Sequence, residues 1–130
     1  MKRFLPLILL SVWLCHGCGN DFDTRLQREA TEYTRKHCPQ KLDGFTTLDS
    51  VAYSPERRTY TRYLSLSPQT PPTLFEKDET VRNLLLQELK ADVGWKRCKD
   101  EGIRFAYVYH WQHSGKVAYS LVFTSEDYNR

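Results

Sequence analysis

The sequence of 130 residues lacks a membrane-spanning apolar run, a strong excess of one charge and any common catalytic motif. Its longest apolar stretch, residues 4–14, has eleven residues, whereas a transmembrane helix needs about 20. A formal net charge of +3 provides no strongly basic face for nucleic acid. The patterns G-x-S-x-G, G-x-x-x-x-G-K-[ST] and H-E-x-x-H do not occur. We therefore expect no nucleic-acid partner and no cofactor, and the sequence favours a non-enzymatic role.

The N-terminus has the composition of an export signal. Lys2 and Arg3 form a short positive region, and residues 4–14 are apolar apart from Pro6 and Ser11. That length is typical of the apolar region of a signal peptide and too short for a membrane span. Removal of residues 1–17 would leave 17 of the 19 basic residues against 16 acidic ones. The exported chain would be nearly neutral.

A C-x-x-C motif, Cys15 to Cys18, follows the apolar region directly. A thioredoxin-like pair needs a strand before the motif and a helix after it, and that context is missing here. A c-type haem site needs His directly after the second cysteine, where Gly19 stands. A redox or haem role is therefore disfavoured.

The segment LCHGC, residues 14–18, resembles the lipobox of bacterial lipoproteins that signal peptidase II processes. Gly17 supplies the small residue before the acceptor Cys18, whereas bulky Leu14 would precede Cys15. The resemblance implies a signal peptide over residues 1–17, a lipid on Cys18 and a lipid-anchored N-terminus over residues 18–20. It also implies the bacterial cell envelope, and Gly19 in place of Asp points to the outer membrane. A plain secretory signal cleaved nearby is the alternative.

Two further cysteines, Cys38 and Cys98, remain in the exported chain. Because export compartments oxidise thiols, this even pair predicts a disulfide. Closing a loop of about 60 residues would stabilise the domain by roughly 4 kcal/mol in the chain-entropy model.

Residues 21–130 read as a single α+β domain. Apolar residues at helical spacing predict a helix from Phe22 to His37, and Val81 to Val93 predict a second that begins near residues 74–79. Alternating residues predict a hairpin that ends with TYTRYLSL and another over residues 103–123. The predicted fold is a four-stranded antiparallel sheet packed under two helices, in the order α-β-β-α-β-β. The disulfide would tie the two helix ends together.

One face of the predicted sheet is poor in charge. If the large residues of the last hairpin point inward, the outward residues are small or semi-apolar, and they are Thr59, Thr61, Tyr63, Ser65, Arg104, Ala106, Val108, His110, Ala118, Ser120, Val122 and Thr124. Tyr63, Arg104 and His110 are the candidate binding residues, because tyrosine and arginine are enriched at interface hot spots. A routine open sheet face is the alternative.

A metal site is not expected. His110 and His113 with the two cysteines could in principle ligate zinc, which takes four tetrahedral ligands. Side chains at positions 110 and 113 point to opposite faces of a strand, and the predicted disulfide would use both sulfurs.

The sequence favours a lipid-anchored envelope protein that binds another macromolecule, as an inhibitor, a pilotin-like protein or an assembly accessory. The expected partner is an envelope protein, and the lipid would provide the membrane contact. The alternative is a small envelope hydrolase or small-molecule carrier with a pocket between sheet and helices. Tyr109 and His110 would be candidates for convergent groups in such a pocket.

Overall fold

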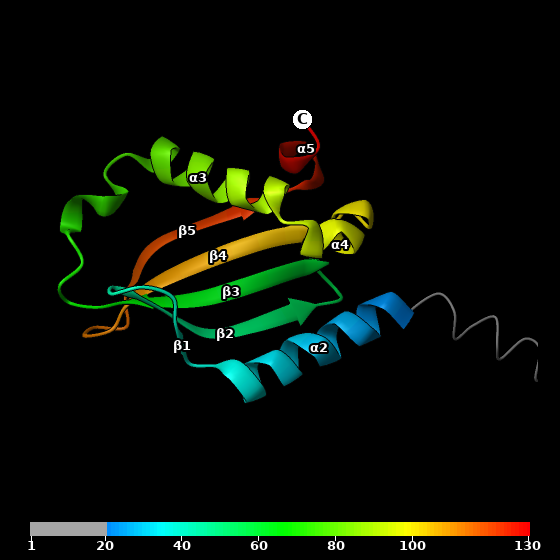
Figure 1. The fold of residues 1–130 in the computed structure, drawn as a ribbon, viewed down its shortest axis with the longest axis horizontal. Coiled ribbons are helices and arrows are strands. Elements are labelled where there is room, and N and C mark those ends of the chain that lie inside the picture. Colours follow the sequence, from blue (N-terminus) through cyan, green and yellow to red (C-terminus); the bar gives the residue numbers. More distant parts are fainter. Residues whose placement is uncertain (1–20) are drawn as a thin grey trace, which may run out of the picture.

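The computed structural model describes residues 21–130 as a sheet with helices on one face (Figure 1). The elements are α2 (Asp21–His37), β1 (Gln40–Lys41), β2 (Thr46–Ser54), β3 (Thr59–Leu66), the short 3-10 helix η1 (Pro72–Phe75), α3 (Asp78–Ala91), η2 (Val93–Trp95), α4 (Lys96–Asp100), β4 (Arg104–Trp111), β5 (Val117–Phe123) and α5 (Ser125–Tyr128). The predicted first helix and both predicted hairpins are confirmed. The predicted second helix is divided into α3, η2 and α4.

The prediction of a four-stranded, fully antiparallel sheet is wrong. The sheet has five strands in the order β1-β2-β3-β4-β5, and β3 and β4 run parallel. The connection between them explains this pairing. The 14 residues of α3 span about 21 Å, most of the roughly 26 Å of β3, so the helix returns the chain to the end where β3 began. Arg104, the first residue of β4, therefore lies beside Thr59, the first residue of β3.

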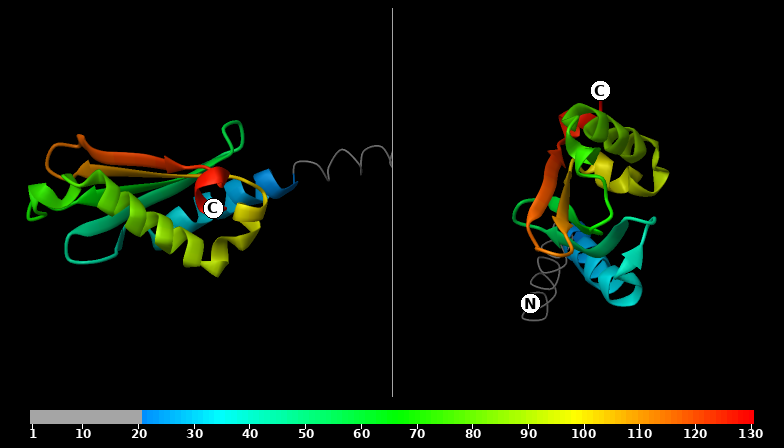
Figure 2. Two further views of the ribbon diagram at one scale, coloured as in Figure 1. Left: turned by 90° about the horizontal axis from the view of Figure 1, so that it is seen from above. Right: turned by 90° about the vertical axis from the view of Figure 1, so that its left-hand side faces the viewer.

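The core lies between the sheet and the helices. Tyr60, Leu64, Phe105, Tyr107 and Phe123 are buried and belong to one hydrophobic cluster that also contains Leu26 and Leu89 of the helices. Alternate strand residues point to the opposite face, which no helix of residues 21–124 covers in Figure 2. The large residues Phe105, Tyr107 and Phe123 are buried as predicted, whereas Ser65 and Ala106, predicted to face outward, are buried as well.

Helix α2 completes the hydrogen bonding of β2. The two-residue β1 pairs only with Thr47 and Leu48, so Val51 has no strand partner on that side. The Thr34 hydroxyl donates to the Val51 carbonyl and accepts from the Val51 amide, both at 2.9 Å. Because unpaired backbone groups are costly when removed from water, this single side chain fixes α2 against the edge of β2.

The predicted disulfide is also wrong, because Cys38 and Cys98 are both free thiols. Cys98 lines a hollow with Phe22, Leu26 and Glu29 of the first half of α2, whereas Cys38 follows the last residue of that helix. Leu26 precedes Cys38 by 12 residues, or about 18 Å at the helical rise. A disulfide needs Cα atoms about 4.4–6.8 Å apart, so this fold keeps the two thiols separate.

Candidate functional site

Two neighbouring hollows form a groove between α2 and the segment that joins α3 to α4. The first has a volume of about 230 Å³ and is lined by Tyr33, Leu48, Val51, Tyr60, Arg62, Asp92 and Trp95. The second has a volume of about 220 Å³ and is lined by Phe22, Arg25, Leu26, Glu29, Gly94, Trp95, Arg97 and Cys98. Trp95 lines both, so the two hollows lie side by side along its side chain. We call them together the helix groove.

Trp95 occupies the centre of the helix groove because η2 places it there. The Asp92 carboxylate accepts a hydrogen bond of 2.9 Å from the Gly94 amide, which starts the turn. The indole then packs edge-on against Tyr60 at 4.8 Å and against Phe105 at 5.5 Å between ring centroids. Trp95 stays partly exposed, so it offers an aromatic surface held by the core beneath it.

Lys99 holds the end of α3 in place. Its ammonium group donates to the carbonyls of Leu89 at 2.9 Å, Lys90 at 3.2 Å and Asp92 at 3.1 Å. The last carbonyls of a helix have no partner within the helix, and a lysine can satisfy them while favouring the negative end of the helix dipole. Lys99 therefore fixes α3 to α4 and sets the position of η2 and Trp95.

Replacement of Lys99 by methionine is expected to lower the free energy of unfolding by about 2 kcal/mol, because three carbonyls at the end of α3, one of them partly buried, lose a charged donor. Urea unfolding of the variant measures this loss. Lys96→Met is the matched control, since Lys96 only pairs with Asp100 on an exposed surface at 2.8 Å and such pairs contribute at most about 1 kcal/mol. Equal unfolding midpoints for the two variants would contradict the role assigned to Lys99.

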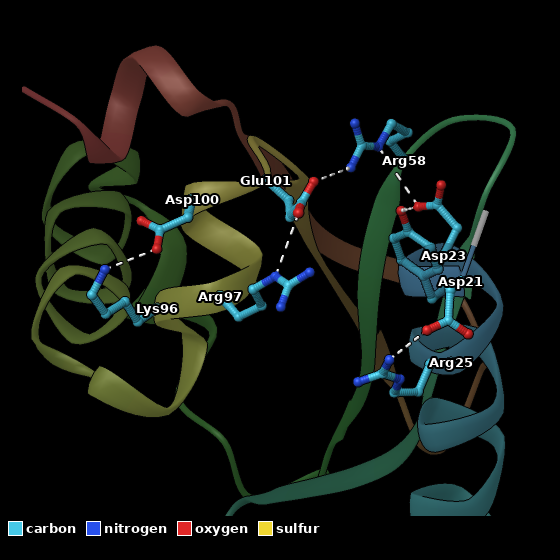
Figure 3. A network of polar contacts seen from close by, with 9 residues as sticks. Asp21, Asp23, Arg25, Arg58, Lys96, Arg97, Asp100 and Glu101 are labelled. Carbon is cyan, nitrogen blue, oxygen red and sulfur yellow. Dashed lines mark hydrogen bonds and ion pairs between the residues drawn. The ribbon is translucent and has the colours of Figure 1, made fainter. Parts of the chain in front are cut away.

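A polar network bridges the walls of the helix groove at one end (Figure 3). Arg58, in the turn between β2 and β3, lies 3.7 Å from Asp23 of α2 and 3.5 Å from Glu101 after α4. Arg97 pairs with Glu101 at 3.4 Å. These ion pairs are partly exposed, so each contributes little stability. They instead fix the relative position of α2 and α4, because both helices contact the turn between β2 and β3.

The tyrosines along the sheet stay neutral over a wide pH range. Burial raises the pKa of Tyr60 and Tyr109 to about 12. Burial likewise raises the pKa of Tyr107, which the charge of Arg62 partly offsets. Burial and a hydrogen bond to Asp23 raise the pKa of Tyr53 to about 12. Of these four tyrosines, only Tyr60 lines the helix groove, so the floor presents one neutral phenol beside the cation Arg62.

The candidate binding residues from the sequence lie on the opposite face of the sheet, outside the helix groove. Tyr63 pairs with Val108 in the middle, whereas Arg104 pairs with Thr59 and His110 pairs with Ser65 toward opposite ends of β4. Tyr63 is 36% exposed. The three share the uncovered face but form no compact cluster, and their role in binding stays a prediction. The alternative pair, Tyr109 and His110, point to opposite faces and do not converge.

The helix groove was not predicted from the sequence, although one residue of the sequence indicates it. Arg62 occupies an inward position of β3, between Tyr60 and Leu64 in the alternating pattern. An arginine at an inward position of an otherwise apolar strand face is unusual unless it is paired or serves a ligand. The wall residues Tyr33 and Trp95 gave no such signal, because they also fit a helical core stripe.

The predicted lipid-attachment residue Cys18 lies outside the described residues. Among residues 21–130, no helix has the length and apolarity to span a bilayer. The same residues contain no group of three or more His, Cys, Asp or Glu side chains arranged to hold a metal ion.

The chain belongs to a family defined as a domain of unknown function, DUF8479, whose model matches residues 21–119. The matched segment runs from α2 to the first three residues of β5 and therefore contains both walls of the helix groove. No curated protein sequence matches the chain.

Three solved structures share the fold at low sequence identity. A secreted protein of Pseudomonas aeruginosa superposes with a TM-score of 0.72 at 12% identity, covering 82% of this chain and 92% of that one. The type 2 secretion system pilotin EpsS of Vibrio vulnificus gives 0.66 at 8% identity, covering 84% and 93%. The type II secretion system pilotin AspS of Vibrio cholerae gives 0.59 at 14% identity, covering 83% and 93%. At these identities the likeness establishes a common fold.

Proposed function

We propose that this protein is a lipid-anchored accessory of a bacterial envelope secretion or assembly system, pilotin-like and non-enzymatic, that binds an envelope protein in its helix groove. The fold shared with EpsS and AspS carries the proposal, since it covers nearly the whole of both pilotins. The lipobox-like segment that ends at Cys18 supports the anchor, and Gly19 favours the outer membrane.

The helix groove has the composition of a protein-binding surface. Its exposed or half-buried residues include Trp95, Tyr33 and Arg62, the three residue types most enriched at interface hot spots. Tyr33 is 38% exposed and stands on the α2 wall, while Trp95 stands on the opposite wall. A partner segment laid between them would cover both aromatic rings and the sheet floor at once.

The uncovered sheet face is the competing surface. Val122 is 47% exposed there, and Tyr63 and Arg104 are the candidate anchors. No helix of residues 21–124 covers this face, so a partner there would be less enclosed than in the helix groove. The proposal therefore places the partner in the groove, and the test includes both surfaces.

Affinity purification of the full-length protein from its own envelope distinguishes them. Trp95→Ala and, separately, Tyr33→Ala are expected to lower the recovery of a co-purifying envelope protein at least tenfold, about 1.4 kcal/mol per tenfold change. Tyr63→Ala combined with Arg104→Ala is the matched control on the other face and is expected to leave recovery unchanged.

Thermal melting of each variant shows whether it is folded. Tyr33→Ala is informative even if Trp95→Ala unfolds, because Tyr33 is largely outside the core. Normal recovery with the folded Tyr33 and Trp95 variants, together with loss in the Tyr63 and Arg104 variant, would place the partner on the uncovered sheet face instead.

A further inference from the structure

Arg62 is a cation on the floor of the helix groove. It lies on the central strand β3, opposite Tyr107 of β4 in the parallel register, and is partly buried. Its guanidinium carbon lies 5.9 Å from the centroid of the Tyr107 ring. The arginine also lines the hollow between Tyr33 and Trp95, and because its side chain is only partly buried, a molecule in the groove would contact it.

Arg62 has no ion-pair partner among residues 21–130. The other arginines around the groove do have one: Arg25 pairs with Asp21 at 2.6 Å, and Arg97 pairs with Glu101 at 3.4 Å. Asp92 lines the same hollow, but one of its carboxylate oxygens accepts from the Gly94 amide. Burying a charge is costly unless it is paired, so a partner that covers Arg62 must also satisfy it.

The surroundings determine which group can do this. The neighbouring groups on the floor are the neutral side chains of Tyr60, Leu48 and Val51. Asp92 is the one acidic residue that lines this hollow, and it forms no ion pair with Arg62 among residues 21–130. A carboxylate can accept two parallel hydrogen bonds from a guanidinium, which gives direction as well as attraction. A neutral amide would leave the arginine charge uncompensated once water is excluded.

We propose that the segment bound in the helix groove is apolar and carries one acidic side chain, which pairs with Arg62. The inference rests on the proposed function and names the chemistry of the partner at the same site. The apolar residues of the segment cover Trp95 and Tyr33, and the acidic residue fixes its register along the groove. The pair is specific because a segment displaced along the groove would leave both charges buried and unpaired.

Site-specific photo-crosslinking in the full-length protein identifies the segment. A benzophenone amino acid at position 33, in place of the exposed Tyr33, is expected to crosslink the partner, and the same group at position 63 on the uncovered face serves as the control. Mass spectrometry then identifies the crosslinked segment of the partner. A synthetic peptide with that sequence is used as the probe in the binding measurements. The expected segment contains Asp or Glu within an apolar stretch.

A charge-swap experiment with that peptide tests the ion pair. Arg62→Glu is expected to weaken peptide binding at least tenfold. Replacing the acidic residue of the peptide by arginine should weaken binding to the native protein and restore binding to the Arg62→Glu protein to within about threefold. Arg62→Gln provides a second variant of similar size, also expected to bind at least tenfold more weakly, and melting curves confirm that each variant is folded.

The outcomes separate the two proposals. Crosslinking from position 63 but not from position 33 would overturn the groove as the docking surface, and the Arg62 pairing with it. Crosslinking from position 33 with a segment that lacks an acidic residue, or with binding that Arg62→Glu and Arg62→Gln leave unchanged, would overturn the pairing alone. Loss of binding that no reversed charge in the peptide restores would also overturn it.

Discussion

Replacement of Cys18 by alanine is expected to remove the protein from the membrane fraction or to leave it unprocessed. The expectation follows from the proposed lipid anchor, because Cys18 is the residue that follows Gly17 after the apolar region. Each CH₂ group of an acyl chain that enters the bilayer contributes about 0.8 kcal/mol, and a singly acylated protein binds only marginally. The resemblance to bacterial lipoproteins implies several acyl chains on this one residue, so their loss should release nearly all of the protein. Membrane fractionation with mass spectrometry of the N-terminal peptide measures both results.

Cys15→Ala is the matched control, since it changes the neighbouring cysteine of the same motif. This variant should still be processed, acylated and retained, because Leu14 makes position 15 a poor cleavage site. Acylation lost in the Cys15 variant and kept in the Cys18 variant would assign the lipid to Cys15. Unchanged membrane association of both variants would argue against the lipid anchor.

Alkaline titration is expected to unfold the domain between about pH 10 and pH 12. In the folded protein the pKa values of Tyr53, Tyr60 and Tyr109 are raised to about 12, with burial as the largest cause, from an ordinary value of 10.0. Above the ordinary value the unfolded chain loses these protons while the folded chain keeps them, so stability falls as pH rises. The stability that these three protonated tyrosines contribute is fully present below pH 10 and is lost as the pH approaches their pKa values in the folded protein.

The size of this effect is several kcal/mol, since one pKa unit corresponds to about 1.4 kcal/mol and three groups are involved. That is comparable with the whole stability of a typical small domain, about 5–15 kcal/mol. Tyrosinate absorbance followed together with circular dichroism measures ionisation and unfolding in the same sample. Both signals should change together, because buried phenols ionise when the fold opens.

Tyr60→Phe should shift the alkaline midpoint upward, because it removes one of the groups that ionise on unfolding. Tyr63→Phe is the matched control on the uncovered face and should leave the midpoint unchanged. Tyrosine ionisation that is complete well below the unfolding transition would show that these phenols are accessible in the folded protein.

The sequence allowed the strand orientation to be predicted because side chains alternate along a strand. Phe105 and Tyr107 share a face with Phe123, and all three are buried as the pattern indicated. The first helix was predictable for a similar reason, since Leu26 and Ala30 recur at helical spacing and are both buried. These properties depend on local periodicity, which the sequence displays directly.

Features that depend on tertiary distances could not be predicted. β1 has two residues, too few to show any pattern, and the parallel pairing of β3 and β4 follows from the path of α3 across the sheet. The predicted exported chain keeps an even pair of cysteines, which favoured a disulfide, but α2 holds Cys38 far from Cys98. Lys99 stands in a run of mixed charge, residues 96–101, which is typical of a solvated surface, whereas its role as a helix cap depends on where α3 ends.

The start of α2 at Asp21 has a consequence for how the protein would stand on a bilayer. Two residues, Gly19 and Asn20, separate Cys18 from Asp21, and the three steps between them span at most about 11 Å, at about 3.6 Å per residue of extended chain. With a lipid on Cys18, such a short tether would hold the domain against the headgroups. The end of the helix groove lined by Phe22 and Arg25 would then be the end nearest the membrane. A partner segment would then have to enter the helix groove close to the lipid headgroups.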